Sequence, residues 1–195
     1  MVKETERKRE TFFFFFFFFK QKKNNKTTKA VEKGGAQSLF TDQLEVERER
    51  GITVHASSAS LVWKGHLLNL IDTPGHIDFQ YEVSRALKAC EGAVLLVDAT
   101  KGVQAQTISN FWLAFEANLT IVPVINKIDL DHADVNNVLQ QLKSMFEIDA
   151  KEVLLTSAKS GLNVEDVMDA VIKRVPPPPS SGKGARLQAL LFDSW

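Results

Sequence analysis

The sequence predicts an α/β domain in which a mostly parallel sheet carries helices on both faces. Short runs rich in β-branched residues recur along the chain, at 66–72, 92–98, 120–126 and 152–158. Stretches with apolar residues three or four apart separate these runs, which is typical of amphipathic helices. Alternating strands and helices require right-handed crossovers and a parallel sheet. Ligands of such sheets bind at the carboxyl ends of the strands.

The segment before the first run predicts an antiparallel strand at the sheet edge. Residues 54–63 read VHASSASLVW, and Lys64-Gly65 separates them from the run at 66–72. Two residues that favour a turn, placed between two strand-like runs, are typical of a β-hairpin.

Three helices are predicted after the later runs. Their apolar positions are Ile108, Phe111, Trp112 and Phe115; then Val135, Val138, Leu139, Leu142 and Phe146; then Val164, Val167, Met168, Val171 and Ile172. Asn163, with Asp166 three residues later, is the expected N-cap of the last helix. The prolines at 176–179 are expected to end it.

The charge of the chain is unevenly distributed. The overall charge is zero, but residues 1–33 carry a net +6 and residues 34–195 a net −6. The basic tail is either simply solvated or binds RNA without sequence preference. Cys90 is the only cysteine, which excludes a disulfide framework and indicates a reducing compartment. Its spacing from Phe79, Val83 and Leu87 places it on the buried face of a helix.

Eight consecutive phenylalanines occupy residues 12–19. The run is far shorter than the roughly 20 residues of a membrane-spanning helix. Acidic residues at positions 4, 6 and 10 argue against a transit peptide, so no targeting peptide is visible. The run is either low-complexity sequence from an imperfect gene model or a short apolar strand, because phenylalanine favours strands.

Polar motifs fall where strands begin or end. They are Arg50-Gly51-Ile52-Thr53, Asp72-Thr73-Pro74-Gly75-His76, Asn126-Lys127-Ile128-Asp129 and Thr156-Ser157-Ala158-Lys159. Each is weak alone, since such residues also form ordinary turns. The last three follow buried strands, so we expect them to converge on one rim of the sheet.

The last two motifs match the demands of a guanine base. Asp129 can accept hydrogen bonds from the guanine N1–H and exocyclic amine, a pair of donors that adenine does not offer. The alternative for Asn126 and Asp129 is turn formation and N-capping. The residues expected to hold the loops and enclose the base are Asn126, Lys127, Ser157, Ala158 (through its backbone N–H) and Lys159.

The first two motifs suit the phosphate side of a nucleotide. Asp72 can bind Mg²⁺ through a water molecule, and Thr53 offers the metal a hydroxyl. Gly75 lets a backbone N–H approach a γ-phosphate. His76 is the candidate catalytic residue, expected to orient the attacking water. The alternative for His76 is a solvated histidine in a turn.

Three stretches resemble the G domain of translational GTPases, most closely the elongation factor 4 (LepA) family. They are residues 44–63, 67–107 and 123–130, within a similarity that spans about residues 40–178. Its specific marks are Glu47-Arg48-Glu49-Arg50, Tyr81-Glu82-Val83-Ser84-Arg85 and Gly102-Val103-Gln104-Ala105-Gln106-Thr107. The KNNK at 23–26 resembles the eukaryotic, mitochondrial branch.

The resemblance implies a P-loop-type GTPase domain that binds GTP or GDP with Mg²⁺ and hydrolyses GTP on the ribosome. It places Thr53 in the first switch and residues 72–76 in the second. It further implies a role in elongation of the back-translocation or fidelity type. The expected partner is ribosomal RNA and not DNA, and the expected form is a monomer in the mitochondrial matrix with peripheral contact to the inner membrane.

The sequence departs from this family at one point. It contains no G-x-x-x-x-G-K-[ST] motif, the loop that cradles phosphates. The strand and loop would precede residue 40, so the sheet is expected to be incomplete unless the phenylalanine run replaces that strand. We therefore divide the chain into a tail (1–35), a partial G domain (36–178), and a linker with the first strand of a truncated β-barrel (179–195). The alternative function is a nucleotide-incompetent product that only binds the ribosome or another partner.

Overall fold

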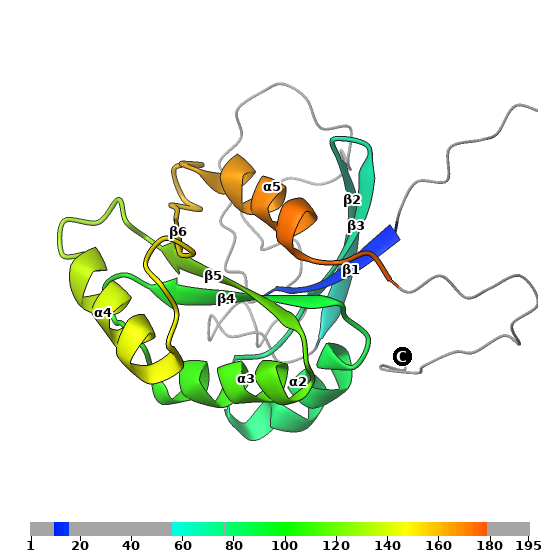
Figure 1. Ribbon diagram of the computed structural model, residues 1–195, viewed down its shortest axis with the longest axis horizontal. Coiled ribbons are helices and arrows are strands. Elements are labelled where there is room, and N and C mark those ends of the chain that lie inside the picture. The colour runs from blue at the N-terminus through cyan, green and yellow to red at the C-terminus, as the bar shows by residue number, and fades with distance from the viewer. Residues whose placement is uncertain (1–9, 16–55, 76, 179–195) are drawn as a thin grey trace, which may run out of the picture.

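The computed structural model of the chain describes residues 10–15, 56–75 and 77–178 (Figure 1). Within these residues, a six-stranded sheet has the strand order β2-β3-β1-β4-β5-β6, and only its β2–β3 pair is antiparallel. The strands are β1 (Glu10–Phe15), β2 (Ser57–Trp63), β3 (His66–Asp72), β4 (Gly92–Asp98), β5 (Thr120–Asn126) and β6 (Leu154–Leu155). The predicted α/β class with a mostly parallel sheet is confirmed.

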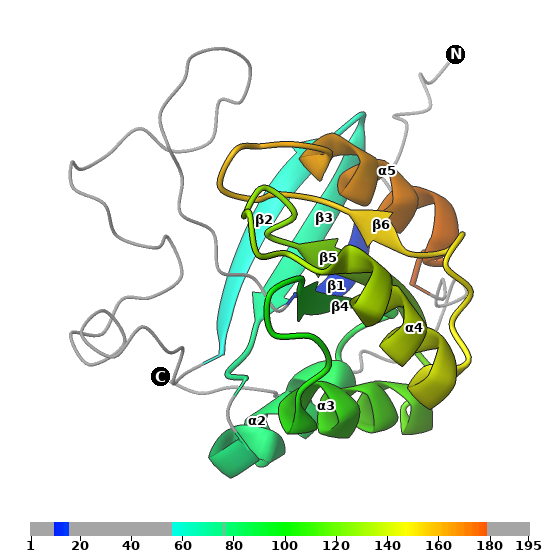
Figure 2. The ribbon, with the colours of Figure 1, turned by 90° about the vertical axis from the view of Figure 1, so that its left-hand side faces the viewer.

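Helices cover both faces of this sheet (Figures 1 and 2). They are the 3₁₀ turn η1 (Ile77–Phe79) and the helices α2 (Gln80–Leu87), α3 (Ala105–Glu116), α4 (Val135–Phe146) and α5 (Val164–Arg174). α5 packs on one face through Val167, Val171 and the following Val175, against Leu68, Val94, Val122 and Val124. α2, α3 and α4 pack on the other face. Within the described ranges, no helix is long and apolar enough to cross a membrane.

Strand β1 fills the position where we expected a gap. It runs parallel to β3 from the Glu10–Leu67 pair to the Phe15–Asp72 pair, and its last three residues also pair with β4. The backbone groups that β3 and β4 would otherwise leave unpaired therefore find partners. For residues 12–15 this confirms that the phenylalanine run forms a strand. The remaining residues of the run, and those of the tail other than 10–15, lie outside the described residues.

The hairpin at the sheet edge forms as predicted. β2 pairs with β3 over its whole length, from Ser57 opposite Asp72 to Trp63 opposite His66. Both turn residues have positive φ, 45° at Lys64 and 82° at Gly65. Positive φ at both central residues defines the turn whose twist matches that of the strands, and glycine adopts it without strain.

The core forms largely as the helical spacing predicted. Val138, Leu142 and Phe146 of α4 are buried against Leu95, Val97 and Ile125 of the sheet. Cys90 is buried in a separate cluster with Val83 and Leu87, as predicted, but it follows α2, which ends at Leu87, and does not lie on a helix. Burial, together with the charge of nearby Glu91, raises the pKa of the Cys90 thiol to about 12, which keeps it neutral and unreactive.

Two predictions about helices were wrong in detail. Asn163 does precede α5, but its side chain makes no cap: φ is 56° and its amide donates to the Leu155 carbonyl oxygen instead. On α3, only Phe111 of the expected apolar stripe is fully buried, whereas Trp112 and Phe115 are 47% and 60% exposed. Both rings instead pack edge to face on each other at the surface. The predicted linker and strand at 179–195 lie outside the described residues.

Candidate functional site

The three predicted motifs that fall within the described residues lie at one edge of the sheet. Asp72 is the last residue of β3, Asn126 is the last residue of β5, and Ser157 lies two residues after β6. Because β3, β5 and β6 run parallel to one another, their carboxyl ends share a rim. The sequence predicted this convergence.

Asn126 joins the loops that follow β5 and β6. Its side chain is only 5% exposed, and its Oδ1 accepts a hydrogen bond of 2.9 Å from the backbone N–H of Ala158. Two backbone bonds support the junction, from Thr156 N–H to the Ile125 oxygen at 2.8 Å and from Ile128 N–H to the Thr156 oxygen at 3.4 Å. Asn126 therefore fixes the Asn126–Asp129 segment relative to the Thr156–Lys159 segment.

Asp129 lies at the surface, and Ser157 influences its carboxylate. A hydrogen bond from the Ser157 hydroxyl lowers the pKa of Asp129, and the charges of Lys159 and Lys127 lower it further. The Ser157 hydroxyl also accepts from the backbone N–H of Ser160 at 3.3 Å. Asp129 is thus ionised at neutral pH and acts only as an acceptor.

Lys127 pairs with a residue that the sequence analysis missed. Its Nζ lies 2.7 Å from Oδ2 of Asp98, the last residue of β4. Burial raises the pKa of Asp98, but hydrogen bonds from Lys127 and Thr100 outweigh that effect and hold the pKa below its usual value. The available signal was position: Asp98 closes a buried strand, as do Asp72 and Asn126.

The phosphate side of the rim is described only in part. Asp72 and Thr73 are buried at the end of β3, and no hydrogen-bond partner faces the Thr73 hydroxyl among the described residues. A carboxylate beside a hydroxyl is the kind of oxygen donor set that Mg²⁺ prefers. Gly75 is half-buried at the turn. The other two residues predicted here, Thr53 and His76, lie outside the described residues.

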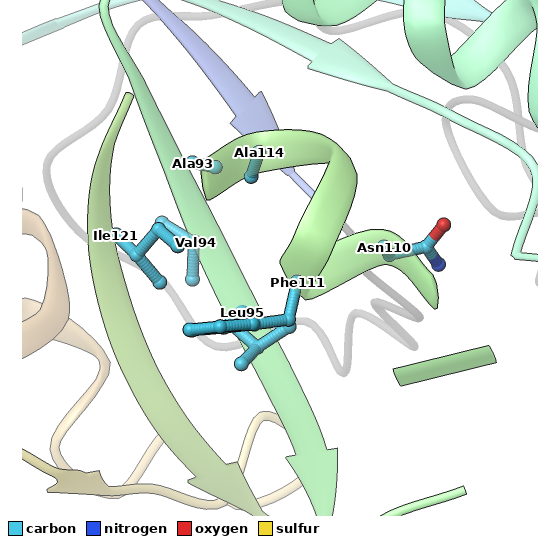
Figure 3. Close-up of a pocket in the computed structure, with 7 residues that line it drawn as sticks. All are labelled: Ala93, Val94, Leu95, Asn110, Phe111, Ala114 and Ile121. Carbon is cyan, nitrogen blue, oxygen red and sulfur yellow. The ribbon is translucent and has the colours of Figure 1, made fainter. Parts of the chain in front are cut away.

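A small cavity lies away from this rim (Figure 3). It has a volume of about 10 Å³ and lies between α3 and strands β4 and β5. Its lining is Ala93, Val94, Leu95, Asn110, Phe111, Ala114 and Ile121, and the Asn110 amide points away from the other six side chains in the picture. The cavity is too apolar and too small for more than one water molecule, so it is not a ligand site.

Solved structures with a similar fold are translation factors. A bacterial selenocysteine-specific elongation factor matches with a TM-score of 0.61 and 25% identity, over 70% of this chain and 24% of its own. Elongation factor SelB from Methanococcus maripaludis, solved with the GTP analogue GPPNHP, matches with a TM-score of 0.56 and 24% identity. That match covers 62% of this chain and 28% of the SelB chain, and it shows the fold alone.

Curated relatives are similar over most of the chain. The Arabidopsis thaliana "Translation factor GUF1 homolog, mitochondrial" is 58% identical over 177 residues, and its Caenorhabditis briggsae counterpart is 59% identical over 166 residues. The matches cover 86% and 85% of this chain but only 26% and 25% of the relatives. The chain thus spans about a quarter of the length of these proteins.

A family model matches most of the chain directly. It is the elongation factor Tu GTP binding domain, and it covers residues 18–177. That range contains all four motifs and the whole of the rim described above. The chain therefore belongs to the elongation factor Tu family of GTP-binding domains.

Proposed function

We propose that this chain is the guanine-nucleotide-binding part of a translation factor that hydrolyses GTP on the ribosome during elongation. Its family membership and its similarity to proteins named as mitochondrial translation factors support this proposal. On the ground of the same similarity we further propose that the protein is a monomer in the mitochondrial matrix with peripheral contact to the inner membrane. Its action in elongation would be of the back-translocation or fidelity type.

The observation that carries the proposal is the arrangement around Asp129. The two loops that would enclose a base are joined by the Asn126–Ala158 bond, and Ser157 and the nearby lysines keep the Asp129 carboxylate ionised. Guanine presents two N–H donors on one edge, which match the two acceptor oxygens of one carboxylate. Adenine would leave this charge without a partner, at a cost that selects against it. Lys127 and Lys159 would flank the base.

The residues on the phosphate side have separate roles in this proposal. Asp72 would hold Mg²⁺ through a water molecule, and Thr53 would contribute a hydroxyl to the metal. Gly75 would donate its backbone N–H to the γ-phosphate, and His76 would orient the attacking water. Phosphoryl transfer depends mainly on such positioning and on charge stabilisation. The bound GTP–Mg²⁺ supplies the phosphoryl group and the positive charge beside it.

A second candidate function rests on the missing phosphate loop. The chain carries no G-x-x-x-x-G-K-[ST], which supplies most backbone contacts to the phosphates in this type of site. A chain that recognises guanine but not phosphate would bind nucleotide weakly. It would then act only as a ribosome- or partner-binding module.

Nucleotide titration of the 195-residue chain distinguishes the two candidates. Fluorescent GDP and ADP would be titrated against the chain and against Asp129→Asn. We expect micromolar or tighter GDP binding, and the substitution should weaken it by at least about 100-fold, because the amide nitrogen of asparagine cannot accept from the guanine N–H that faces it. Xanthine nucleotides, which carry an oxygen in place of the exocyclic amine, should bind Asp129→Asn better than the unsubstituted chain.

The control is Asp131→Asn, which removes an exposed carboxylate two residues away. Its GDP affinity should stay within about twofold, since isolated surface charges contribute little. No GDP binding by the unsubstituted chain would favour the module instead. Equal affinity for GDP and ADP would rule out the assignment of Asp129 to guanine.

A further inference from the structure

Lys127 has two carboxylates in its neighbourhood, and in the described structure it pairs with Asp98, whose Oδ2 lies 2.7 Å from its Nζ. Asp129 follows Lys127 by two residues in the same loop. The charge of Lys127 also lowers the pKa of Asp129, so Asp129 is the alternative partner for this ammonium group if Asp98 is lost. Which carboxylate holds the ammonium decides how many acceptor positions Asp129 keeps.

Several hydrogen bonds hold Asp98 in place, which favours it over Asp129 as the partner of Lys127. Its Oδ1 accepts from the backbone N–H of Thr100 at 2.8 Å and from the Thr100 hydroxyl at 2.7 Å. Its backbone oxygen accepts from Gly102 N–H at 2.9 Å, and it lies opposite Asn126 in the β4–β5 register. Oδ1 of Asp98 thus accepts hydrogen bonds within the turn, and Oδ2 pairs with Lys127.

We infer that Asp98 is a positioning residue for guanine recognition: it holds the Lys127 ammonium against the end of β4 and so keeps the Asp129 carboxylate open for the base. The inference rests on the function proposed above, and it adds a residue that contacts no ligand. The geometry supports it in two ways. Asp98 is a half-buried side chain fixed at a strand end, whereas Asp129 lies exposed in a loop. Lys127 itself has a φ of 66°, so its backbone leaves the strand in a sharp turn that brings its side chain back over β4.

Asp98→Asn separates the two functions of this side chain. The amide oxygen still accepts from Thr100, so the turn after β4 is kept. The amide nitrogen replaces Oδ2 and cannot accept from an ammonium group. Lys127 is then free to pair with Asp129. Asp131→Asn is the matched control, because it removes one carboxylate near the same loop without contact to Lys127 in the described structure.

Guanosine and inosine are the probes, and NMR titration of the full chain measures millimolar as well as tighter binding. Neither carries a phosphate, so the missing phosphate loop does not affect the comparison. Inosine lacks only the exocyclic amine that would donate a hydrogen bond to Asp129. The ratio of the guanosine and inosine affinities therefore reports directly on that hydrogen bond. We expect Asp98→Asn to weaken guanosine binding by about 3- to 10-fold and to bring the ratio toward 1, as for loss of one close charge pair.

The control and a double variant complete the test. Asp131→Asn should change neither the guanosine affinity nor the ratio by more than about twofold. In a Lys127→Met background, Asp98→Asn should cause no further fall in the ratio, because no ammonium remains to be released. An unchanged ratio in Asp98→Asn, or a further fall in the Lys127→Met background, would overturn this inference alone. Failure of the unsubstituted chain to bind guanosine would overturn the proposed function and this inference with it.

Discussion

The Asn126 side chain has a structural role that precedes any role in binding. Its Oδ1 is the acceptor for the Ala158 N–H, and both residues are buried. A buried backbone N–H without a partner is costly, because it has given up its hydrogen bond to water. The arrangement of the two loops at the proposed base site therefore depends on one side-chain oxygen.

We predict that Asn126→Ala lowers the free energy of unfolding by about 1–3 kcal/mol, the cost of leaving the Ala158 N–H unpaired. Urea unfolding followed by circular dichroism measures this. Asn136→Ala is the control, since Asn136 is exposed on α4 and surface substitutions usually change stability by less than about 0.5 kcal/mol. Equal unfolding midpoints for the two variants would show that the loops do not depend on this hydrogen bond.

The candidate site residues that follow strands could be predicted from the sequence, but the residues that hold them in place could not. Asn126 and Ser157 stand out in sequence because a polar residue closes an apolar run. The pairing of Asp98 with Lys127 depends on β4 and β5 being neighbours in a register that places Asp98 opposite Asn126. No local pattern encodes that register, so only the folded sheet brings the two side chains together.

Between elements, Asp169 of α5 ties the edge hairpin to the helix. Its Oδ1 accepts from Trp63 Nε1 at 2.8 Å, and its Oδ2 accepts from Lys64 Nζ at 2.5 Å. The hydrogen bond from Lys64, followed by that from Trp63, lowers the pKa of Asp169 below its ordinary 3.8. The link joins the only antiparallel strand of the described sheet to the helix that packs on that face.

We predict that Asp169→Asn loses the Lys64 contact and unfolds at a lower urea concentration than the unsubstituted chain at pH 7. A carboxyl whose folded pKa is depressed stabilises fully above its unfolded pKa, and this contribution disappears as the pH falls through the folded pKa. The difference between the two midpoints should therefore shrink below about pH 4. Asp131→Asn should show no such difference at either pH, and a constant gap for Asp169→Asn would contradict the prediction.

The helices show where periodicity alone is insufficient. The spacing placed α3, α4 and α5 correctly, because a buried face is a property of local sequence. It also placed Trp112 and Phe115 in the core, where they are not. How far an apolar stripe is covered depends on the neighbouring helix: Phe146 of α4 stacks on Phe111, and Ile108 packs against the same core cluster, whereas Trp112 and Phe115 stay exposed. The Asn163 cap failed for a related reason, since its amide donates instead to the carbonyl oxygen of Leu155, the last residue of β6.

At the scale of the whole molecule, the sheet depends on a strand that family similarity does not predict. The family match begins at residue 18, whereas β1 ends at Phe15. β1 nevertheless joins the hairpin to β4, β5 and β6, because it pairs with both β3 and β4. Alternation along the chain predicted the class of fold, but it could not assign this inner strand, because eight identical residues carry no period. The pairing follows from the strand propensity of phenylalanine and from the open backbone groups on either side.

Because β1 is an inner strand, we expect the backbone of Phe13 to be essential: it pairs with Leu70 on one side and with Gly92 on the other. Phe13→Pro removes a backbone N–H that an inner strand uses and should destabilise the fold by about 3 kcal/mol or more. Phe13→Val keeps the N–H and a strand-favouring side chain, so it is the matched control. Urea unfolding gives the stability. Limited chymotrypsin digestion then reports whether cleavage after residues 12–15 becomes faster in the proline variant. Equal unfolding midpoints, or rapid cleavage there in the unsubstituted chain while residues 56–178 stay intact, would show that the sheet holds together without β1.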